Sequence, residues 1–156
     1  MNEKGYITSN LYDWTKEEEK GFFEKYIDKL RENVELKPFA KEIIHALKQE
    51  HEIYIVTARD KITDKDPCEE AKLYLEKHGI FFDEIIAECH DKLKYCLENK
   101  IDVIIDDEPQ NIDAIAPKIP VIVFRGVQNE NCSGKNVMKV DNWKEVYEII
   151  KKLEKK

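Results

Sequence analysis

The residues of this chain best suited to chemistry are two adjacent carboxylates, Asp106 and Asp107, directly after the apolar stretch 103–105. A second apolar stretch, 53–56, ends in the hydroxyl residue Thr57. In an open parallel sheet the ligand lies beyond the carboxyl ends of the strands, so a hydroxyl from one strand and carboxylates from another can converge on one anion and one metal ion. This pattern indicates phosphoryl chemistry.

A lysine lies between these two stretches in the sequence. Lys92 begins a predicted helix, Lys92 to Glu98, which leads directly into the acidic strand. Glu108 follows Asp106 and Asp107, and three adjacent acids are costly without a cation, so a metal site is favoured over simple helix capping. The combined pattern predicts a site for a phosphate group and a cation.

These segments resemble the haloacid dehalogenase-like (HAD) phosphohydrolases, and within them the small 5'-nucleotidase (deoxyribonucleotidase)-like branch. The matching segments are 55–59 (Ile-Val-Thr-Ala-Arg), 91–93 (Asp-Lys-Leu) and 104–109 (Ile-Ile-Asp-Asp-Glu-Pro). The resemblance extends from about Val34 to the C-terminus and is weaker before it. It implies Mg2+-dependent hydrolysis of a small phosphorylated molecule, with a nucleoside monophosphate as one candidate.

The resemblance also implies a role for each residue. Thr57 would donate its hydroxyl to a phosphoryl oxygen, and the Ala58 amide would add a second donor. Lys92 would neutralise the transferring group. Asp107 would be the better Mg2+ ligand, and Asp106 would assist through a water or by orienting loop amides.

Two further residues are candidates for substrate contact. Arg59 is equally suited to binding phosphate and to pairing with an acid. Trp14 lies outside any periodic pattern, which makes it a candidate for stacking on a base. The aromatic stripe of Phe22, Phe23 and Tyr26 is instead predicted to belong to the core, because its spacing is helical.

One departure from the family concerns catalysis. The family carries its nucleophilic and acid/base aspartates in an Asp-x-Asp-x-Thr motif after its first strand, and this chain has no such motif. Asp13 lacks the second aspartate and is predicted to cap the helix that begins at Lys16. The chain is therefore expected to be inactive, with only weak Mg2+ binding. A non-catalytic phosphate-binding or interaction module is the alternative, and a longer form of the protein that starts upstream is another.

The same departure concerns the sheet. In the family, the first strand lies between the threonine strand and the acidic strand, so its absence would leave two apolar edges unpaired. Three ways of filling the gap are open: the segment 6–11, a strand from a second copy of the chain, or direct pairing of 53–56 with 103–106. The oligomeric state is left open by the sequence.

Alternating strands and helices predict an α/β fold, a three-layer sandwich with a parallel Rossmann-like (HAD-like) sheet, because the strands are continuous Ile/Val runs. One domain is expected over 1–156, with a small helical cap remnant at 5–33 and a core at 34–156 that lacks its first strand. The predicted helices are Lys16–Glu32, Pro38–Gln49, Pro67–His78, Lys92–Glu98, Gln110–Ala116 and Asn142–Leu153. The predicted strands are Glu52–Thr57, Glu84–Ala87, Asp102–Asp106 and Val121–Phe124.

Composition narrows the possible partners. Hydrophobic residues make up 42% of the chain, which is ordinary for a globular domain. Charged residues make up 38%, and the net charge of −7 argues against nucleic acid as a partner. It has no membrane-length apolar stretch and no signal-peptide core, so a cytoplasmic location is expected. The four cysteines lack the spacing of zinc ligands and are predicted to be inert thiols, with Cys132 exposed in a polar loop.

Overall fold

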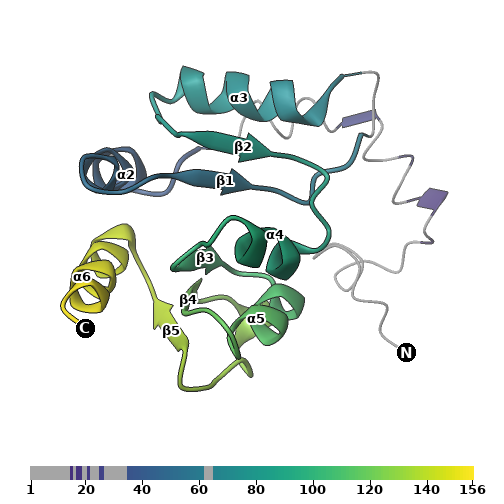
Figure 1. Cartoon of the computed structure of the whole chain (residues 1–156). Coiled ribbons are helices and arrows are strands. Elements are labelled where there is room, and N and C mark those ends of the chain that lie inside the picture. The colour runs from purple at the N-terminus through teal and green to yellow at the C-terminus, as the bar shows by residue number, and fades with distance from the viewer. Residues whose placement is uncertain (1–14, 16, 19–20, 22–24, 27–34, 62–64) are drawn as a thin grey trace.

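The computed structural model describes residues 35–61 and 65–156, together with 15, 17, 18, 21, 25 and 26. Helices and strands alternate along the described chain (Figure 1). The α-helices are α2 (Ala40–Lys48), α3 (Pro67–Lys77), α4 (Lys92–Glu98), α5 (Pro109–Ile115) and α6 (Trp143–Glu154). The strands are β1 (Tyr54–Val56), β2 (Glu84–Ile86), β3 (Ile104–Asp106), β4 (Val121–Phe124) and β5 (Val137–Val140), and a short 3-10 helix, η2 (Val127–Asn129), precedes β5. The α/β class predicted from the sequence is confirmed.

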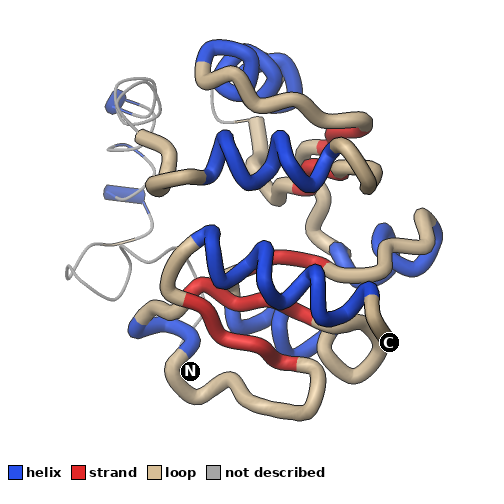
Figure 2. The backbone as a smooth tube through the Cα atoms, turned by 90° about the vertical axis from the view of Figure 1, so that its left-hand side faces the viewer, coloured by secondary structure: helices blue, strands red, loops and turns tan. Residues whose placement is uncertain are grey.

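The strands form two parallel sheets. β1 pairs with β2, with Ile55 opposite Ile85. β4 pairs with β3 and with β5, with Ile122 opposite Ile105 on one side and Met138 on the other. The two groups of strands stay apart in both views (Figures 1 and 2). Direct pairing of 53–56 with 103–106, one of the three expected ways to close the gap, does not occur.

The carboxyl ends of the two sheets nevertheless lie at the same edge. The Thr57 carbonyl, just after β1, accepts a hydrogen bond of 3.0 Å from the Cys89 amide, just after β2. Three residues further on, the Lys92 ammonium reaches Asp106 at the end of β3, at 2.8 Å. The ends of β1, β2 and β3 therefore lie on the same side of the molecule, which the predicted site requires.

The core lies on both faces of the β3–β5 sheet. Val121, Ile122 and Val123 of β4 are all 0% exposed, because alternate side chains enter opposite layers. The layer that contains α4 and α5 is formed by Cys96, Ile112, Ile115, Ile119, Val121, Val123 and Cys132. The layer that contains α2 and α6 is formed by Leu47, Ile122, Val140, Val146 and Ile150. This sheet is the centre of a three-layer sandwich, as expected.

Helix boundaries follow from local chemistry. Asp66 caps α3 by accepting a bond of 2.8 Å from the Cys68 amide, and Pro67 occupies the first turn, where its missing N–H costs nothing. Gly79 follows the helix with a φ of +69°, the left-handed conformation that glycine adopts most readily. Asn142 caps α6 in the same way, accepting a bond of 3.0 Å from the Glu145 amide.

Several expectations about individual elements were wrong. Strand β5 was not predicted, because Lys139 interrupts its short apolar pattern; the Lys139 ammonium donates to the Glu130 carbonyl at 2.7 Å. The helix predicted from Pro38 begins at Ala40 instead, because Phe39 has a left-handed φ of 65°; its side chain is 53% exposed. Cys132 is buried, since its loop folds over the core. The proposed cap, 5–33, lies almost wholly outside the described residues, and the segment 6–11 lies entirely outside them.

One carboxylate joins three elements around the start of the smaller sheet. Asp83, just before β2, accepts hydrogen bonds of 2.7 Å from the Lys48 ammonium of α2 and from the Ile53 amide before β1. The hydrogen bond from Lys48 and that from the Ile53 amide hold the pKa of Asp83 below its ordinary value of 3.8. The charged form is therefore the one that stabilises the fold.

We expect Asp83→Asn to lower the stability of the protein near pH 7. Because the folded pKa of Asp83 is depressed, its contribution is complete above the ordinary value and is lost as the pH falls through the folded value. The difference in urea midpoint between wild type and Asp83→Asn, followed by circular dichroism, should therefore shrink on acidification. Lys48→Met is the matched control, and a difference independent of pH would contradict the ion-pair explanation.

Candidate functional site

Asp106, at the end of β3, accepts four hydrogen bonds through its carboxylate. It is 8% exposed, and its Oδ2 accepts hydrogen bonds from the Lys92 ammonium at 2.8 Å and from the Asn111 amide group at 3.1 Å. Its Oδ1 accepts from the backbone amides of Asp107 at 2.8 Å and Glu108 at 3.0 Å. Both oxygens are thus engaged within the protein, and they fix the loop between β3 and α5.

Lys92 is placed by the start of α4. Asp91 caps this helix by accepting a hydrogen bond of 3.0 Å from the Lys94 amide. Lys92 is therefore the first residue of α4, and its side chain projects from the first turn. The side chain is 13% exposed and its ammonium lies against Asp106. An ammonium has three protons to donate, so the ion pair leaves donor capacity for an anion.

Asp107 is in a different environment from its neighbour. Its side chain is exposed, and its Oδ2 accepts one long hydrogen bond, 3.4 Å, from the Gln128 amide group. Its carbonyl is held by the Asn129 amide group at 3.0 Å. A carboxylate with so little internal hydrogen bonding is suited to ligating a cation, whereas Asp106 is suited to holding the loop.

Asn129 was not predicted as a site residue. It is 1% exposed, donates to the carbonyls of Asp107 at 3.0 Å and Phe124 at 2.9 Å, and accepts from the Gly126 amide at 3.1 Å. It thereby fastens the end of β4 to the acidic loop. Asn111, the partner of Asp106, was missed as well. The position of Asn111, five residues after Asp106 and in the first turn of α5, was the signal that could have found it.

The threonine follows β1, which belongs to a different sheet from the strand that ends in Asp106. The Thr57 hydroxyl accepts a hydrogen bond of 3.3 Å from the Arg59 amide, which folds the chain into a tight turn after β1. The Arg59 carbonyl accepts from the Glu88 amide at 3.1 Å, and both Ala58 and Arg59 are exposed. Trp14, the other predicted substrate contact, lies outside the described residues.

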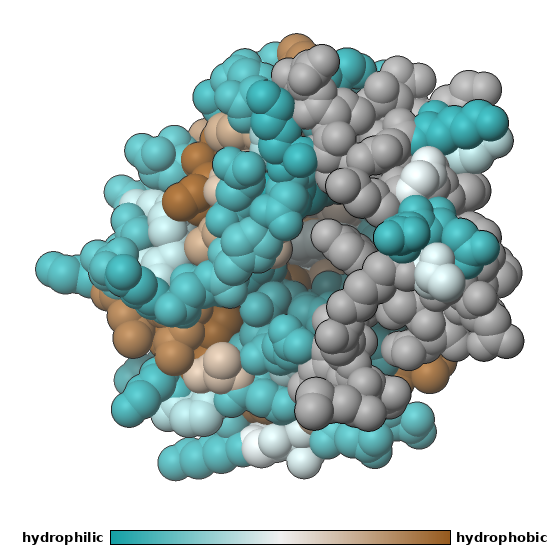
Figure 3. Space-filling view, turned by 90° about the vertical axis from the view of Figure 1, so that its right-hand side faces the viewer, coloured by the Kyte–Doolittle hydropathy of each residue, from teal (hydrophilic) through white to brown (hydrophobic). Residues whose placement is uncertain are grey.

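A cavity of about 1030 Å³ lies between the two sheets. Its walls include the facing strands β1 and β3, and Lys92, Asp106 and Asp107 belong to its lining. On the side of the molecule toward which β1 and β2 point, hydrophilic residues cover most of the described surface, with hydrophobic residues in patches between them (Figure 3). The site is thus a polar opening to a largely apolar groove.

The thiols near the site are poor nucleophiles. Burial raises the pKa of Cys89, just after β2, and of Cys96 in α4, although Lys92 acts in the opposite direction on both. A raised pKa keeps a thiol protonated and unreactive at neutral pH. This direction is what the sequence-based prediction of inert thiols requires for Cys89 and Cys96.

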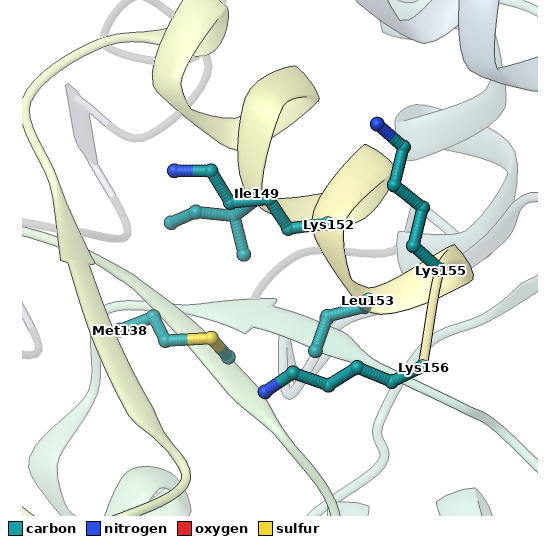
Figure 4. Close-up of a pocket in the computed structure, with 6 residues that line it drawn as sticks. All are labelled: Met138, Ile149, Lys152, Leu153, Lys155 and Lys156. Atoms are coloured by element: carbon teal, nitrogen blue, oxygen red, sulfur yellow. The ribbon is translucent and has the colours of Figure 1, made fainter.

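Two other features of the described chain lie away from the strand ends. Glu50, His51 and Glu154 bring together three side chains of metal-ligand type, but Lys151 already forms ion pairs with both glutamates. A hollow of about 500 Å³ between β5 and α6 is floored by Met138, Ile149 and Leu153, with three lysines around it (Figure 4). Neither feature includes a predicted site residue. No helix in the described part of the chain is long and apolar enough to cross a membrane.

The chain matches known proteins along nearly its whole length. The sequence model of a family described as "5' nucleotidase, deoxy (Pyrimidine), cytosolic type C protein" matches residues 3–156. A nucleotidase of Clostridium acetobutylicum is 30% identical over 150 residues, which are 95% of this chain and 76% of that protein. YqfW of Bacillus subtilis, also named as a nucleotidase, is 27% identical over 139 residues, which are 86% of this chain and 65% of that protein. The chain is therefore shorter than both relatives.

The ion pair between Lys92 and Asp106 is predicted to stabilise the fold in addition to its role at the site. Lys92→Met leaves the buried Asp106 carboxylate without its counter-ion, which should reduce the free energy of unfolding by about 3 kcal/mol. In the double variant Lys92→Met with Asp106→Asn the buried charge is absent, so at least half of that loss should be recovered. Urea unfolding of the two single variants and the double variant gives the coupling energy. Additive losses would mean that the two groups do not depend on each other.

Proposed function

The chain belongs to the 5'-nucleotidase family of haloacid dehalogenase-like proteins, and from this membership we propose that its site binds a phosphomonoester, with nucleoside monophosphates as the substrate class. The fold is that of a nucleotidase-like phosphohydrolase. The observation that carries the proposal is the buried Lys92–Asp106 pair at the strand ends, with the exposed Asp107 carboxylate beside it.

The donors at the site suit an anionic ligand. In this proposal, the Thr57 hydroxyl and the Ala58 amide donate hydrogen bonds to phosphoryl oxygens. The Lys92 ammonium donates one of its three protons to Asp106 and has two left for the phosphoryl group. Its positive charge would neutralise the phosphoryl group as charge shifts during transfer. Arg59, in the exposed turn after β1, is the candidate for a further contact with the phosphate.

The charges at the site call for a cation. Lys92 and Asp106 neutralise each other, and Asp107 adds a negative charge that would repel a phosphate dianion. Mg2+ prefers carboxylate oxygens and retains several waters, and the weakly bonded Asp107 offers such an oxygen. Asp107 would therefore hold Mg2+, while Asp106 orients the loop amides that support it. The ion would supply charge neutralisation of the phosphoryl group.

Catalysis needs groups that this sequence does not supply. The proposed site has no carboxylate in the role of the Asp-x-Asp-x-Thr motif, whose first aspartate attacks phosphorus and whose second protonates the leaving oxygen. We therefore expect this chain to bind phosphate without turning it over. A non-catalytic phosphate-binding module of the same fold is the second candidate, and it is favoured by the complete engagement of Asp106 within the protein.

Mg2+ binding is expected to be weak and to depend on Asp107. A single carboxylate gives only part of a coordination shell, and Mg2+ loses water reluctantly. Titration calorimetry of the full chain should show weak binding that Asp107→Ala abolishes, whereas Asp102→Ala, which removes an exposed acid at the other end of β3, should leave it unchanged. A tight site unaffected by Asp107→Ala would refute this assignment.

Turnover is expected only when the missing motif is supplied. The chain, assayed with nucleoside monophosphates and p-nitrophenyl phosphate in Mg2+, should show no hydrolysis above a Lys92→Ala control. Adding an upstream strand that ends in Asp-x-Asp-x-Thr should create activity that is lost on Thr57→Ala, Lys92→Ala or Asp107→Ala.

Two outcomes separate the candidates. An extended form that binds phosphate but never hydrolyses it would favour the non-catalytic module. Robust turnover by the chain as given, lost on Asp13→Ala, would show that Asp13 is the nucleophile and that the expected inactivity is wrong.

A further inference from the structure

The carboxamide of Gln128 lies beside the Asp107 carboxylate, although the two residues follow different strands. Gln128 belongs to η2, after β4, and its Nε2 donates a hydrogen bond of 3.4 Å to the Asp107 Oδ2. An ordinary N–H···O hydrogen bond is about 2.9 Å long, so this one is weak. Both side chains are exposed. The contact can therefore be exchanged for another at little cost.

The loop that carries Gln128 is fastened to the acidic loop by its neighbour. Asn129 is 1% exposed, accepts a hydrogen bond from the Gly126 amide at 3.1 Å and donates one to the Asp107 carbonyl at 3.0 Å. The Cys132 amide donates to the Asn129 carbonyl at 3.0 Å, which holds the loop on its other side. The backbone of Gln128 is thus kept in a fixed place next to Asp107.

Gly126 leaves the space in which the Gln128 carboxamide lies. A Cβ atom at Gly126 would be 2.3 Å from the Gln128 Oε1 and 2.8 Å from its Nε2, which is too close for either atom to stay in place. The backbone of Gly126 is extended, with a φ of −155°, so its conformation alone does not require glycine. A side chain at this position would displace the carboxamide from its place beside Asp107.

A carboxamide can present either of two ends to the same neighbour. Half a turn about its last side-chain bond exchanges the N–H donors for the carbonyl oxygen, an acceptor. A bare carboxylate favours the N–H end, whereas a cation held by that carboxylate favours the oxygen. Neighbouring ligands of octahedral Mg2+ lie about 3.0 Å apart, because each is about 2.1 Å from the ion. The 3.4 Å between Gln128 and Asp107 is close to this spacing.

We propose that Gln128 is a second ligand of the cation at Asp107 and binds it through Oε1. Without the ion, the Gln128 N–H bonds to Asp107; with the ion, the carboxamide turns and its oxygen coordinates. This ligand is neutral, so it completes more of the coordination shell without adding a charge that repels a phosphate dianion. The proposal rests on the proposed Mg2+ site at Asp107 and adds a residue from a second loop to it.

The test is a titration of the full chain with Mg2+, followed by calorimetry and by nuclear magnetic resonance of the side-chain amides. Gln128→Leu keeps the bulk but removes the oxygen, so it should bind Mg2+ at least threefold more weakly. Gly126→Ala displaces the carboxamide and should weaken binding to the same extent. Gln128→Glu offers a charged oxygen in the same place and should bind at least fivefold more tightly. In wild type, the Gln128 amide signals, identified by their absence from Gln128→Glu, should shift as Mg2+ binds.

Two controls separate coordination from a general effect of charge. Val127 is 93% exposed, so Val127→Glu adds the same charge on the same loop with its side chain in solvent, and it should change the affinity less than twofold. Gly126→Ala combined with Gln128→Glu should lose most of the gain of Gln128→Glu, because a ligand must be in place, whereas the attraction of a charge extends about 10 Å and survives a small displacement.

The outcomes distinguish this proposal from the proposed function. Unchanged Mg2+ affinity in Gln128→Leu, or a gain that persists in full in the double variant, overturns the role of Gln128. If Asp107→Ala still abolishes binding in that case, the Mg2+ site stands without Gln128. If Asp107→Ala leaves binding unchanged, or if neither wild type nor Gln128→Glu binds Mg2+, both the site and the role of Gln128 are refuted.

Discussion

The arrangement of the strand ends depends on one ion pair, between Lys92 at the start of α4 and Asp106 at the end of β3. A buried carboxylate is unfavourable alone, and here it is satisfied by an ammonium, a side-chain amide and two backbone amides. Because these partners come from the helices before and after β3, the pair fixes both loops at once. The position of Asp107 follows from that constraint.

The two sheets are connected by this pair and by the apolar layer that contains α2 and α6, against which Ile53, before β1, also packs. At the opposite end of the groove, His51 bonds to Glu154 at 2.5 Å and Lys151 pairs with Glu50, which joins the chain before β1 to α6. Helices α2 and α6 also contact each other. Exposed ion pairs contribute little to stability, so the apolar helix contact and the buried pair are the stronger connections between the sheets.

The bounds of a helix or strand could be predicted from the sequence where neighbouring residues determine them. Helix α4 and strand β4 have the predicted bounds, because Asp91 caps one and Pro120 and Arg125 delimit the other. Burial set by distant contacts could not be predicted. Asn129 and Cys132 are buried because a polar loop folds over the core, and β5 is a strand because β4 lies beside it. The pairing of Lys92 with Asp106 also depends on tertiary structure, since the two residues are brought together from different elements.

The adjacent aspartates show how one backbone step separates two roles. Successive side chains of a strand point to opposite sides, so the last residue of β3 turns into the protein and the next one turns out of it. Asp106 consequently meets Lys92, whereas Asp107 remains exposed, with its carbonyl held by the buried Asn129. The two acids therefore have different environments although they are adjacent in the sequence. The inner carboxylate accepts four hydrogen bonds within the loop and from its neighbours, whereas the outer one accepts a single long hydrogen bond from Gln128.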